Sequence, residues 1–242
     1  MIKAFFLTLI TAIVACSNIL EANIEQGEDL LEAEVSGAVK GKVDVGPAYI
    51  HLDILESGRT IDRLDMMGVR ADFSYFIHRG LYIKPTVLYG NGGSHKGGLF
   101  TASLGLGYLI PLCKNFLIAP SFGVNYGHIW TKVDFPAYQL RDLTETFKSW
   151  APFIEADIYY TFVPGWRVCA GVQYSWSRSD IKIDKLGKSK SKSQGFAYSL
   201  LLEHDLNDQW SCNIGAAYNL SLSKEKHGLR GKGVKVGIVR WF

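Results

Sequence analysis

The chain has 242 residues, with 26 lysines and arginines against 23 acidic residues and a formal net charge of +3 at pH 7. Glycine (25 residues) and aromatic residues (13%) are abundant, and the length suits a single β-domain. No stretch of about 18 apolar residues occurs, which excludes a membrane-spanning helix.

The first residues have the pattern of an export signal. Lys3 supplies a positive start, and residues 4–15 form a continuous apolar run. Two cleavage points are open: a lipobox-like sequence precedes Cys16, and Leu20-Glu21-Ala22 suits an ordinary signal peptidase. We expect a signal peptide over 1–22, with cleavage before Cys16 as the alternative.

Alternation of apolar and small or polar residues recurs along the rest of the chain and predicts β-strands. The segment from Trp166 to Trp176 is an example. Its even positions are apolar or aromatic, and its odd positions from Gly171 onward are small or polar. The pattern predicts ten strands, over about 35–54, 65–77, 81–90, 99–110, 116–130, 150–162, 166–179, 195–205, 209–223 and 233–242.

Three features favour membrane strands over a soluble sandwich. The segments run to about 10 to 15 residues, which suits tilted membrane strands. Aromatic residues lie near both ends of the apolar faces, as in interfacial girdles. Short connections also alternate with long ones, as expected for a barrel. The long connections are expected at 55–64, 91–98, 131–149, 180–194 and 224–232.

Two of these segments carry further expectations. Leu140, Leu143 and Phe147 have the spacing of a short surface helix in the third long connection. In the first strand the apolar parity shifts near Gly46-Pro47, which predicts a β-bulge, since proline donates no ladder hydrogen bond. The alternative is that residues 35–45 form a separate segment.

The last ten residues carry a resemblance. Val234, Val236 and Ile238 share one face, and the chain stops on Phe242. This resembles the closing strand of bacterial outer-membrane β-barrels, with Arg240 as a departure. The resemblance implies that Phe242 is part of a signal read by the barrel-assembly machinery. It also implies a location in the outer membrane, contact with its lipid and lipopolysaccharide, and periplasmic termini. The expected division is a short periplasmic segment over 23–34 and an all-β transmembrane antiparallel barrel over 35–242.

Ten strands with both ends on one side resemble the layout of the omptins, which are outer-membrane proteases. The amino-terminal third carries short matches to them at Ser36-Gly37, Gly41-Lys42, Tyr49, Gly58-Arg59 and Leu64-Asp65. Omptin catalysis implies an aspartate pair in one external loop region and an Asp–His couple across the rim. Here residues 90–98 contain His95 but no acid, and the fourth long connection has Asp180 and Asp184 but no histidine. We therefore expect no catalytic residues, and enzymatic activity stays an open alternative.

The inward faces of the predicted strands carry charges of both signs. Buried charges must be paired, so a near balance permits a lumen closed by ion pairs, with a narrow channel as the alternative. The candidate lumen ion-pair residues are Arg70, Asp72, Lys84, Glu155, Asp157, Arg167, Glu203 and Lys235, to which the first strand could add Lys40, Lys42 and Asp44. By contrast, His204-Asp205 lies beside a predicted turn and is expected to be a surface pair.

Basic residues gather in the fourth and fifth long connections, which are neighbours around the predicted rim. The candidate polyanion-binding residues are Lys182, Lys185, Lys188, Lys190, Lys192, Lys224, Lys226, Arg230 and Lys232. They predict contact with lipopolysaccharide phosphates or capture of host glycans or acidic proteins. Nucleic acid is not expected, because stacking aromatics are missing from these segments. No metal-ligand spacing and no cofactor motif is found. The expected role is surface binding or support of the envelope, with a narrow channel or an omptin-like hydrolase as alternatives.

Overall fold

The computed structural model describes residues 39–78, 80–92, 97–135, 140–184 and 187–242. The expected segments 1–22 and 23–34, with Cys16, lie outside the described residues. The strands are β1 (Gly41–Glu56), β2 (Arg59–His78), β3 (Leu81–Gly92), β4 (Gly97–Tyr108), β5 (Ile110–Cys113), β6 (Phe116–Phe135), β7 (Leu140–Val163), β8 (Trp166–Ile183), β9 (Gly187–Asn207), β10 (Trp210–Leu222) and β11 (Gly228–Trp241). Within these described ranges, no helix is long and apolar enough to cross a membrane.

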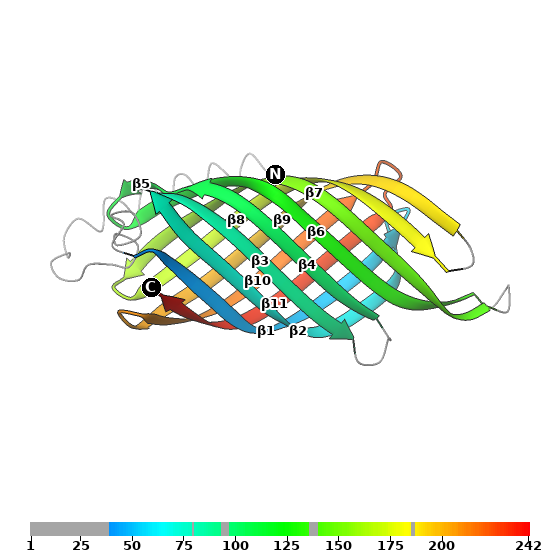
Figure 1. Cartoon of the computed structure of the whole chain (residues 1–242), viewed down its shortest axis with the longest axis horizontal. Helices are drawn as coiled ribbons and strands as arrows, with labels where there is room; N and C mark the ends of the chain where they lie inside the picture. The colour runs from blue at the N-terminus through cyan, green and yellow to red at the C-terminus, as the bar shows by residue number, and fades with distance from the viewer. Residues whose placement is uncertain (1–38, 79, 93–96, 136–139, 185–186) are drawn as a thin grey trace.

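Strand pairing closes the sheet on itself. Neighbouring strands pair antiparallel from β4 through β1, β11 and β7 to β6, and a β4–β6 pairing completes the ring (Figure 1). β4 and β5 are one strand interrupted at Leu109, because Gly107↔Ser121 and Ile110↔Ile118 lie in the same register on β6. With β4 and β5 counted as one strand, the barrel has ten strands. The prediction of an all-β antiparallel barrel of about ten strands is confirmed.

The outward face of the barrel is apolar and exposed. Side chains alternate between the two faces of each strand, and the large hydrophobic side chains on the outward parity stay accessible: Ile214 and Ile238 are each 57% exposed. An exposed apolar surface of this extent is unfavourable in water. Such a surface is stable in contact with the hydrocarbon of a membrane, and the closed barrel leaves no unpaired strand edge to face lipid.

Aromatic residues border this apolar belt on both sides. One girdle contains Tyr75, Tyr108, Phe162, Trp166, Trp210 and Phe242, and the other contains Tyr49, Tyr89, Trp150 and Trp176. Arg240, the departure from the closing-strand pattern, lies in the first girdle with its guanidinium 5.5 Å from the centre of the Trp210 ring. A cation–π contact at the interface accounts for a charge at this outward position.

The two ends of the barrel differ. At the end we call the terminal end, both ends of the described chain meet, where the N–H of Lys40 donates to the carbonyl of Phe242 over 2.7 Å. The opposite end, at the right in Figure 1, we call the far end. It carries the β1–β2, β6–β7, β8–β9 and β10–β11 hairpins.

The expected long connections at the far end are largely strand. β1 and β2 are joined by Ser57-Gly58 alone, both at positive φ (50° and 79°), as the favoured two-residue hairpin turn requires. β6 continues to Phe135 and β8 to Ile183. The expected surface helix at Leu140, Leu143 and Phe147 is wrong, because these residues belong to β7. Hydrogen bonding to an adjacent long strand continues the ladder beyond the apolar belt.

The expected bulge at Gly46-Pro47 is also wrong. The pairs Val45↔Ile238 and Ala48↔Lys235 keep one register with β11, and the register with β2 is continuous to Ile54. Pro47 lacks a donor, so the ladder is interrupted there without slipping. The apparent parity shift arises because Ile50, with Leu52 and Ile54 beyond it, faces the interior and is buried.

Apolar side chains fill parts of the interior at two levels. A far-end cluster contains Ile50, Leu52, Ile54, Leu64, Met66, Leu99 and Ile129, with Leu88, Phe147 and Leu229 packed against it. A terminal-end cluster contains Tyr82, Leu109, Leu117 and Ala119, packed against Phe76 and Tyr159. The charged lumen residues lie between and beside these two clusters.

Candidate functional site

The first charged cluster in the lumen is centred on Asp72. This carboxylate accepts hydrogen bonds from Arg70 Nε (2.8 Å), Thr86 Oγ1 (2.8 Å) and Lys235 Nζ (2.9 Å). Lys235 also pairs with Asp44 over 2.5 Å, which joins β1, β2 and β11. The cluster therefore connects the two terminal strands of the barrel across its closing seam.

A second cluster joins β3 to β7 across the lumen. Lys84 pairs with Asp157 (3.0 Å) and lies 3.7 Å from Glu155. Ser121 donates to Glu155 over 3.3 Å. One ammonium thus faces two carboxylates on neighbouring positions of one strand face, which is how the low-dielectric interior tolerates these charges.

A third cluster closes the lumen near the terminal end. Buried Arg167 donates to Glu203 and to Asp205, each over 2.6 Å. Its guanidinium lies 5.0 Å from the Trp241 ring, and Lys42 Nζ lies 4.3 Å from the same ring. All eight candidate lumen residues thus lie in three ion-pair clusters on the inward face. Lys42 and Asp44 join them, while Lys40 is exposed at the terminal end.

The expected surface pair of His204 and Asp205 is wrong. Asp205 faces the lumen and binds Arg167, whereas His204 faces outward, with its ring 4.2 Å from that of Trp166. Adjacent residues of a strand point to opposite faces, so the alternation itself was the signal that separates them.

The basic residues of the β8–β9 hairpin form an outward-facing array. We name Arg178, Lys182, Lys188, Lys190 and Lys192 the basic wall; all five are exposed and share the outward parity of β8 and β9. Serines alternate with them on the inward side, where Ser177 and Ser193 hydroxyls lie 2.6 Å apart. Within the described residues, Lys188, Lys190 and Lys192 form no ion pair. Lys185 lies outside the described residues.

The basic wall is continuous with the aromatic girdle beneath it. Trp150, Arg178 and Lys192 are direct neighbours across β7, β8 and β9, and Lys148, Asp180 and Lys190 form the next row outward. Arg178 lies within the strand predicted over 166–179 but was not among the candidate basic residues, and Lys148 lies in the segment expected to be the connection 131–149. Extending the alternation of the strand predicted over 150–162 back to residue 148 would have found Lys148.

The remaining basic residues form a separate surface. β10 separates β9 from β11, which carries Arg230 and Lys232, and Lys224 and Lys226 lie in the turn between β10 and β11. Arg230 is already paired with Asp53 over 2.8 Å. The expected single patch is therefore divided into the basic wall, where Lys182 pairs with Asp184, and a second surface on which Arg230 is neutralised by Asp53.

Asp53 is the centre of a polar cluster on the outer wall beyond the apolar belt. Its side chain is only 2% exposed, beneath Arg230, Arg63 and His51. His51 also lies 2.7 Å from Asp65 through Nδ1. Burial alone would raise the pKa of Asp53, but the hydrogen bond and charge of Arg230 dominate, so the pKa lies below its usual value.

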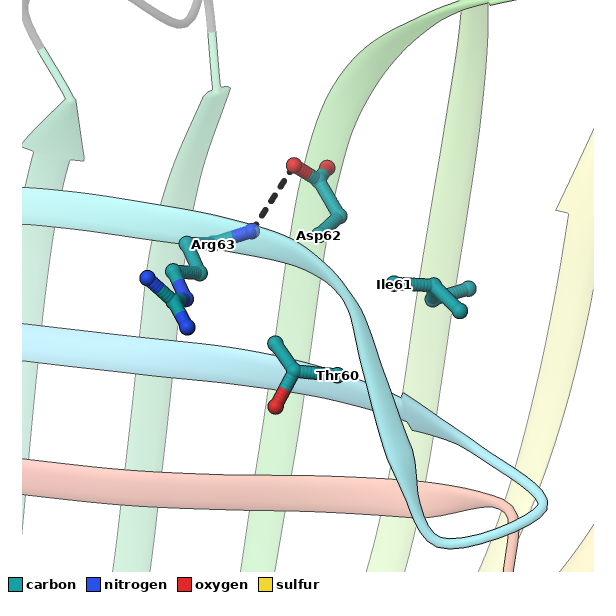
Figure 2. Close-up of a pocket in the computed structure, with 4 residues that line it drawn as sticks. All are labelled: Thr60, Ile61, Asp62 and Arg63. Atoms are coloured by element: carbon teal, nitrogen blue, oxygen red, sulfur yellow. Dashed lines mark hydrogen bonds between the residues drawn. The ribbon is translucent and has the colours of Figure 1, made fainter.

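A shallow pocket adjoins this cluster at the start of β2. It has a volume of about 320 Å³ and is lined by Thr60, Ile61, Asp62 and Arg63. Figure 2 shows Asp62 turned back to accept a hydrogen bond from the backbone N–H of Arg63, over 2.7 Å. The Asp62 carboxylate is thus hydrogen-bonded to its own neighbour, and the Ile61 side chain points away from Asp62 and Arg63. Asp62 is the one acidic residue among the four lining residues, so the pocket brings together no pair of catalytic side chains.

The remaining expected site residues are placed individually. Phe242 faces outward and stacks on Phe73, with ring centres 5.9 Å apart. Asp180 and Asp184 lie on the β8–β9 hairpin, where Asp184 is 3.1 Å from Lys182. His95 lies outside the described residues.

Comparison with solved structures identifies the same fold. The outer-membrane protease OmpT from Escherichia coli matches with a TM-score of 0.51 and 12% identity, over 84% of this chain and 97% of that one. The translocator domain of the autotransporter NalP from Neisseria meningitidis gives 0.49 and 12%, over 99% and 97%. Ail from Yersinia pestis, in complex with the heparin analogue sucrose octasulfate, gives 0.44 and 9%, over 84% and 99%.

At these identities the likeness shows the fold. The chain has the fold of bacterial outer-membrane β-barrels, as its closing strand predicts. The apolar outward belt and the closed barrel support an outer-membrane location. No family model and no curated protein matches the chain.

Proposed function

We propose that the protein is a surface-exposed outer-membrane barrel that binds anionic polymers and phosphorylated glycolipids through the basic wall. The observation that carries this proposal is the outward row of Lys188, Lys190 and Lys192, which form no ion pair within the described residues, although Asp180 is the cross-strand neighbour of Lys190. In this proposal the termini are periplasmic and the far end faces the outside of the cell.

The position of the basic wall supports this class of ligand. Arg178 and Lys148 lie one row beyond aromatic side chains that suit the lipid–water interface. Phosphates of the surrounding outer leaflet would lie at this level, and the more distant lysines could contact anionic saccharide groups. Each basic residue near such a surface contributes about 1 kcal/mol, and the attraction weakens as salt is added.

The lumen supports a binding role more than a channel role. Three ion-pair clusters and the terminal-end apolar cluster occupy its terminal half. A packed interior is usual for barrels of this size, whereas open aqueous pores require about 16 strands.

The test compares two variants with equal charge changes. In one, Lys188, Lys190 and Lys192 become Gln; in the control, Lys224, Lys226 and Lys232 become Gln. Binding of refolded protein to immobilised heparin, and to vesicles containing phosphorylated lipid A, is measured at several salt concentrations. Three lost contacts at about 1 kcal/mol each predict a loss on the order of 100-fold for the first variant.

The control variant is expected to bind within about threefold of the wild type, because the two variants differ only in the surface altered. Equal losses of binding in both variants would show that the net charge of the protein, and not the basic wall, determines binding. Unchanged binding by the first variant would overturn the proposal.

A further inference from the structure

Several residues on the inward face are exposed, which indicates solvent-accessible space inside the barrel. Ser199, Ala217 and Asn219 belong to the inward parity of β9 and β10, yet each is exposed. The glycines confirm where they point: a Cβ at Gly171 would meet Ser199 Oγ at 2.5 Å, and one at Gly231 would meet Asn219 Cβ and Leu52 Cδ1 at 3.8 Å. Their exposure is therefore to the lumen.

Arg70 faces the lumen from β2. Two strands separate β2 from β10 and three separate it from β9, so Arg70 and the exposed residues face the space from different parts of the wall. The Arg70 side chain is 37% exposed although it points inward to Asp72. It uses Nε and one terminal nitrogen on that carboxylate, which leaves N–H donors of its guanidinium for another acceptor.

The space is closed toward the terminal end. Below the exposed residues, Asn213, Glu203, Arg167 and Trp241 are all buried. Asn213 donates to Asp44 over 2.8 Å. Toward the far end, the inward residues of β8 to β10 stay partly accessible as far as the hairpins. Among the described residues, the lumen is thus a vestibule that is closed toward the terminal end and accessible toward the far end.

The walls of the vestibule differ in chemistry. The Ser193 hydroxyl lies 2.6 Å from that of Ser177 and 3.0 Å from that of Ser221. The aliphatic residues of the far-end cluster begin next to these serines, at Leu229, which is the cross-strand neighbour of Ser221, and continue to Leu52 on β1. The charges near the floor are internally paired, so a ligand meets hydroxyls, an amide, spare guanidinium donors and an aliphatic face.

We propose that this vestibule binds a neutral, hydroxyl-rich molecule of the size of a mono- or disaccharide. Such a molecule has hydroxyl groups for Asn219, the serines and Arg70, and C–H faces for the aliphatic wall. An anionic ligand would add charge to paired clusters that already contain Asp72 and Asp44, and a purely apolar ligand would leave the polar wall without partners. This site is independent of the basic wall.

The experiment uses Ala217→Trp, which fills the vestibule, and Ala216→Trp, which adds the same side chain at the adjacent outward position. Saturation-transfer NMR with glucose, maltose and a panel of neutral disaccharides is recorded on the refolded full-length barrel. The wild type and A216W are expected to bind at least one of these sugars, and A217W is expected to bind it at least about tenfold more weakly.

Folding of each variant is verified by heat-modifiable gel migration. If A217W does not fold, Asn219→Leu replaces it, because this change removes an amide without adding a ring. Equal binding by the wild type and the vestibule variant would overturn the proposal. The absence of binding by every sugar in the panel would overturn it equally.

Discussion

At the scale of single residues, Asp53 shows how a charge is held on the outer wall. Its carboxylate is buried beneath a histidine and two arginines that come from β1, β2 and β11. These strands include both partners of the β1–β11 seam. The cluster therefore stabilises the far end of the junction where the first and last strands meet.

Asp53→Asn is expected to destabilise the barrel by about 1 to 3 kcal/mol, because a charged hydrogen bond is lost while Arg230 remains. Since the folded-state pKa of Asp53 lies below its unfolded value, its contribution is present above the unfolded pKa and is lost as the pH falls through the folded pKa. Urea unfolding in lipid vesicles should therefore separate wild type from variant at neutral pH and bring them together in strong acid.

The control for this prediction is Asp180→Asn, an exposed carboxylate on β8. It should change stability by less than about 0.5 kcal/mol. A difference between wild type and D53N that is independent of pH would contradict the assigned role of the Asp53 charge.

At the scale of elements, glycines permit the close approach of neighbouring strands. A Cβ at Gly46 would lie 1.8 Å from the Val236 carbonyl oxygen, whereas one at Gly105 would meet Phe153 at an ordinary 3.5 Å. Gly46 precedes Pro47, which interrupts the ladder with β11 without shifting its register. The absence of a side chain at residue 46 therefore allows the close approach of β1 and β11.

Gly46→Ala is expected to destabilise the barrel by on the order of 3 kcal/mol, because backbone rather than a flexible side chain blocks the added methyl group. Gly105→Ala should stay near wild type. Refolding yield and urea midpoints in the same vesicles measure both. Equal stabilities of the two variants would show that β1 and β11 can separate locally at little cost.

At the scale of the whole molecule, the described part of the barrel is apolar outside, with buried inward residues near the terminal end and solvent-accessible inward residues toward the far end. Two similar contacts lie on opposite faces near the terminal end: Arg167 over Trp241 inside, and Arg240 over Trp210 outside. The inner contact closes the lumen together with Glu203, whereas the outer one meets the lipid interface.

The wild type is expected to give no stable conductance steps in planar bilayers. The double variant Arg167→Ala/Trp241→Ala should conduct, because it removes the two largest groups that close the terminal end. The matched variant Arg240→Ala/Trp210→Ala changes the same residue types outside and should stay silent. Stable steps from the wild type would show that the lumen is a channel.

How far the sequence predicts this molecule depends on the kind of feature. Strand number, the inward position of residues such as Arg70 and Glu203, and the outward position of Val236 follow from alternation alone. The prediction of a bulge in the first strand was wrong because inward residues there, such as Ile50, are apolar. Alternation alone does not distinguish an apolar side chain that packs inside the barrel from one that faces lipid. It also failed where strands continued into polar sequence, as at Lys188.

The sequence by itself determined a closed antiparallel barrel and the face of nearly every side chain, since a pleated strand sends alternate residues to opposite sides. Only the tertiary structure decided which charges meet, because partners such as Lys84 and Asp157 come from strands that the register alone brings together. It also decided that the basic residues of β8 and β9 lie on strands that extend beyond the apolar belt, and that Arg167, Glu203 and Trp241 are buried near the terminal end of the lumen. Both depend on how far each strand remains hydrogen-bonded to its neighbour and on the packing that closes one end.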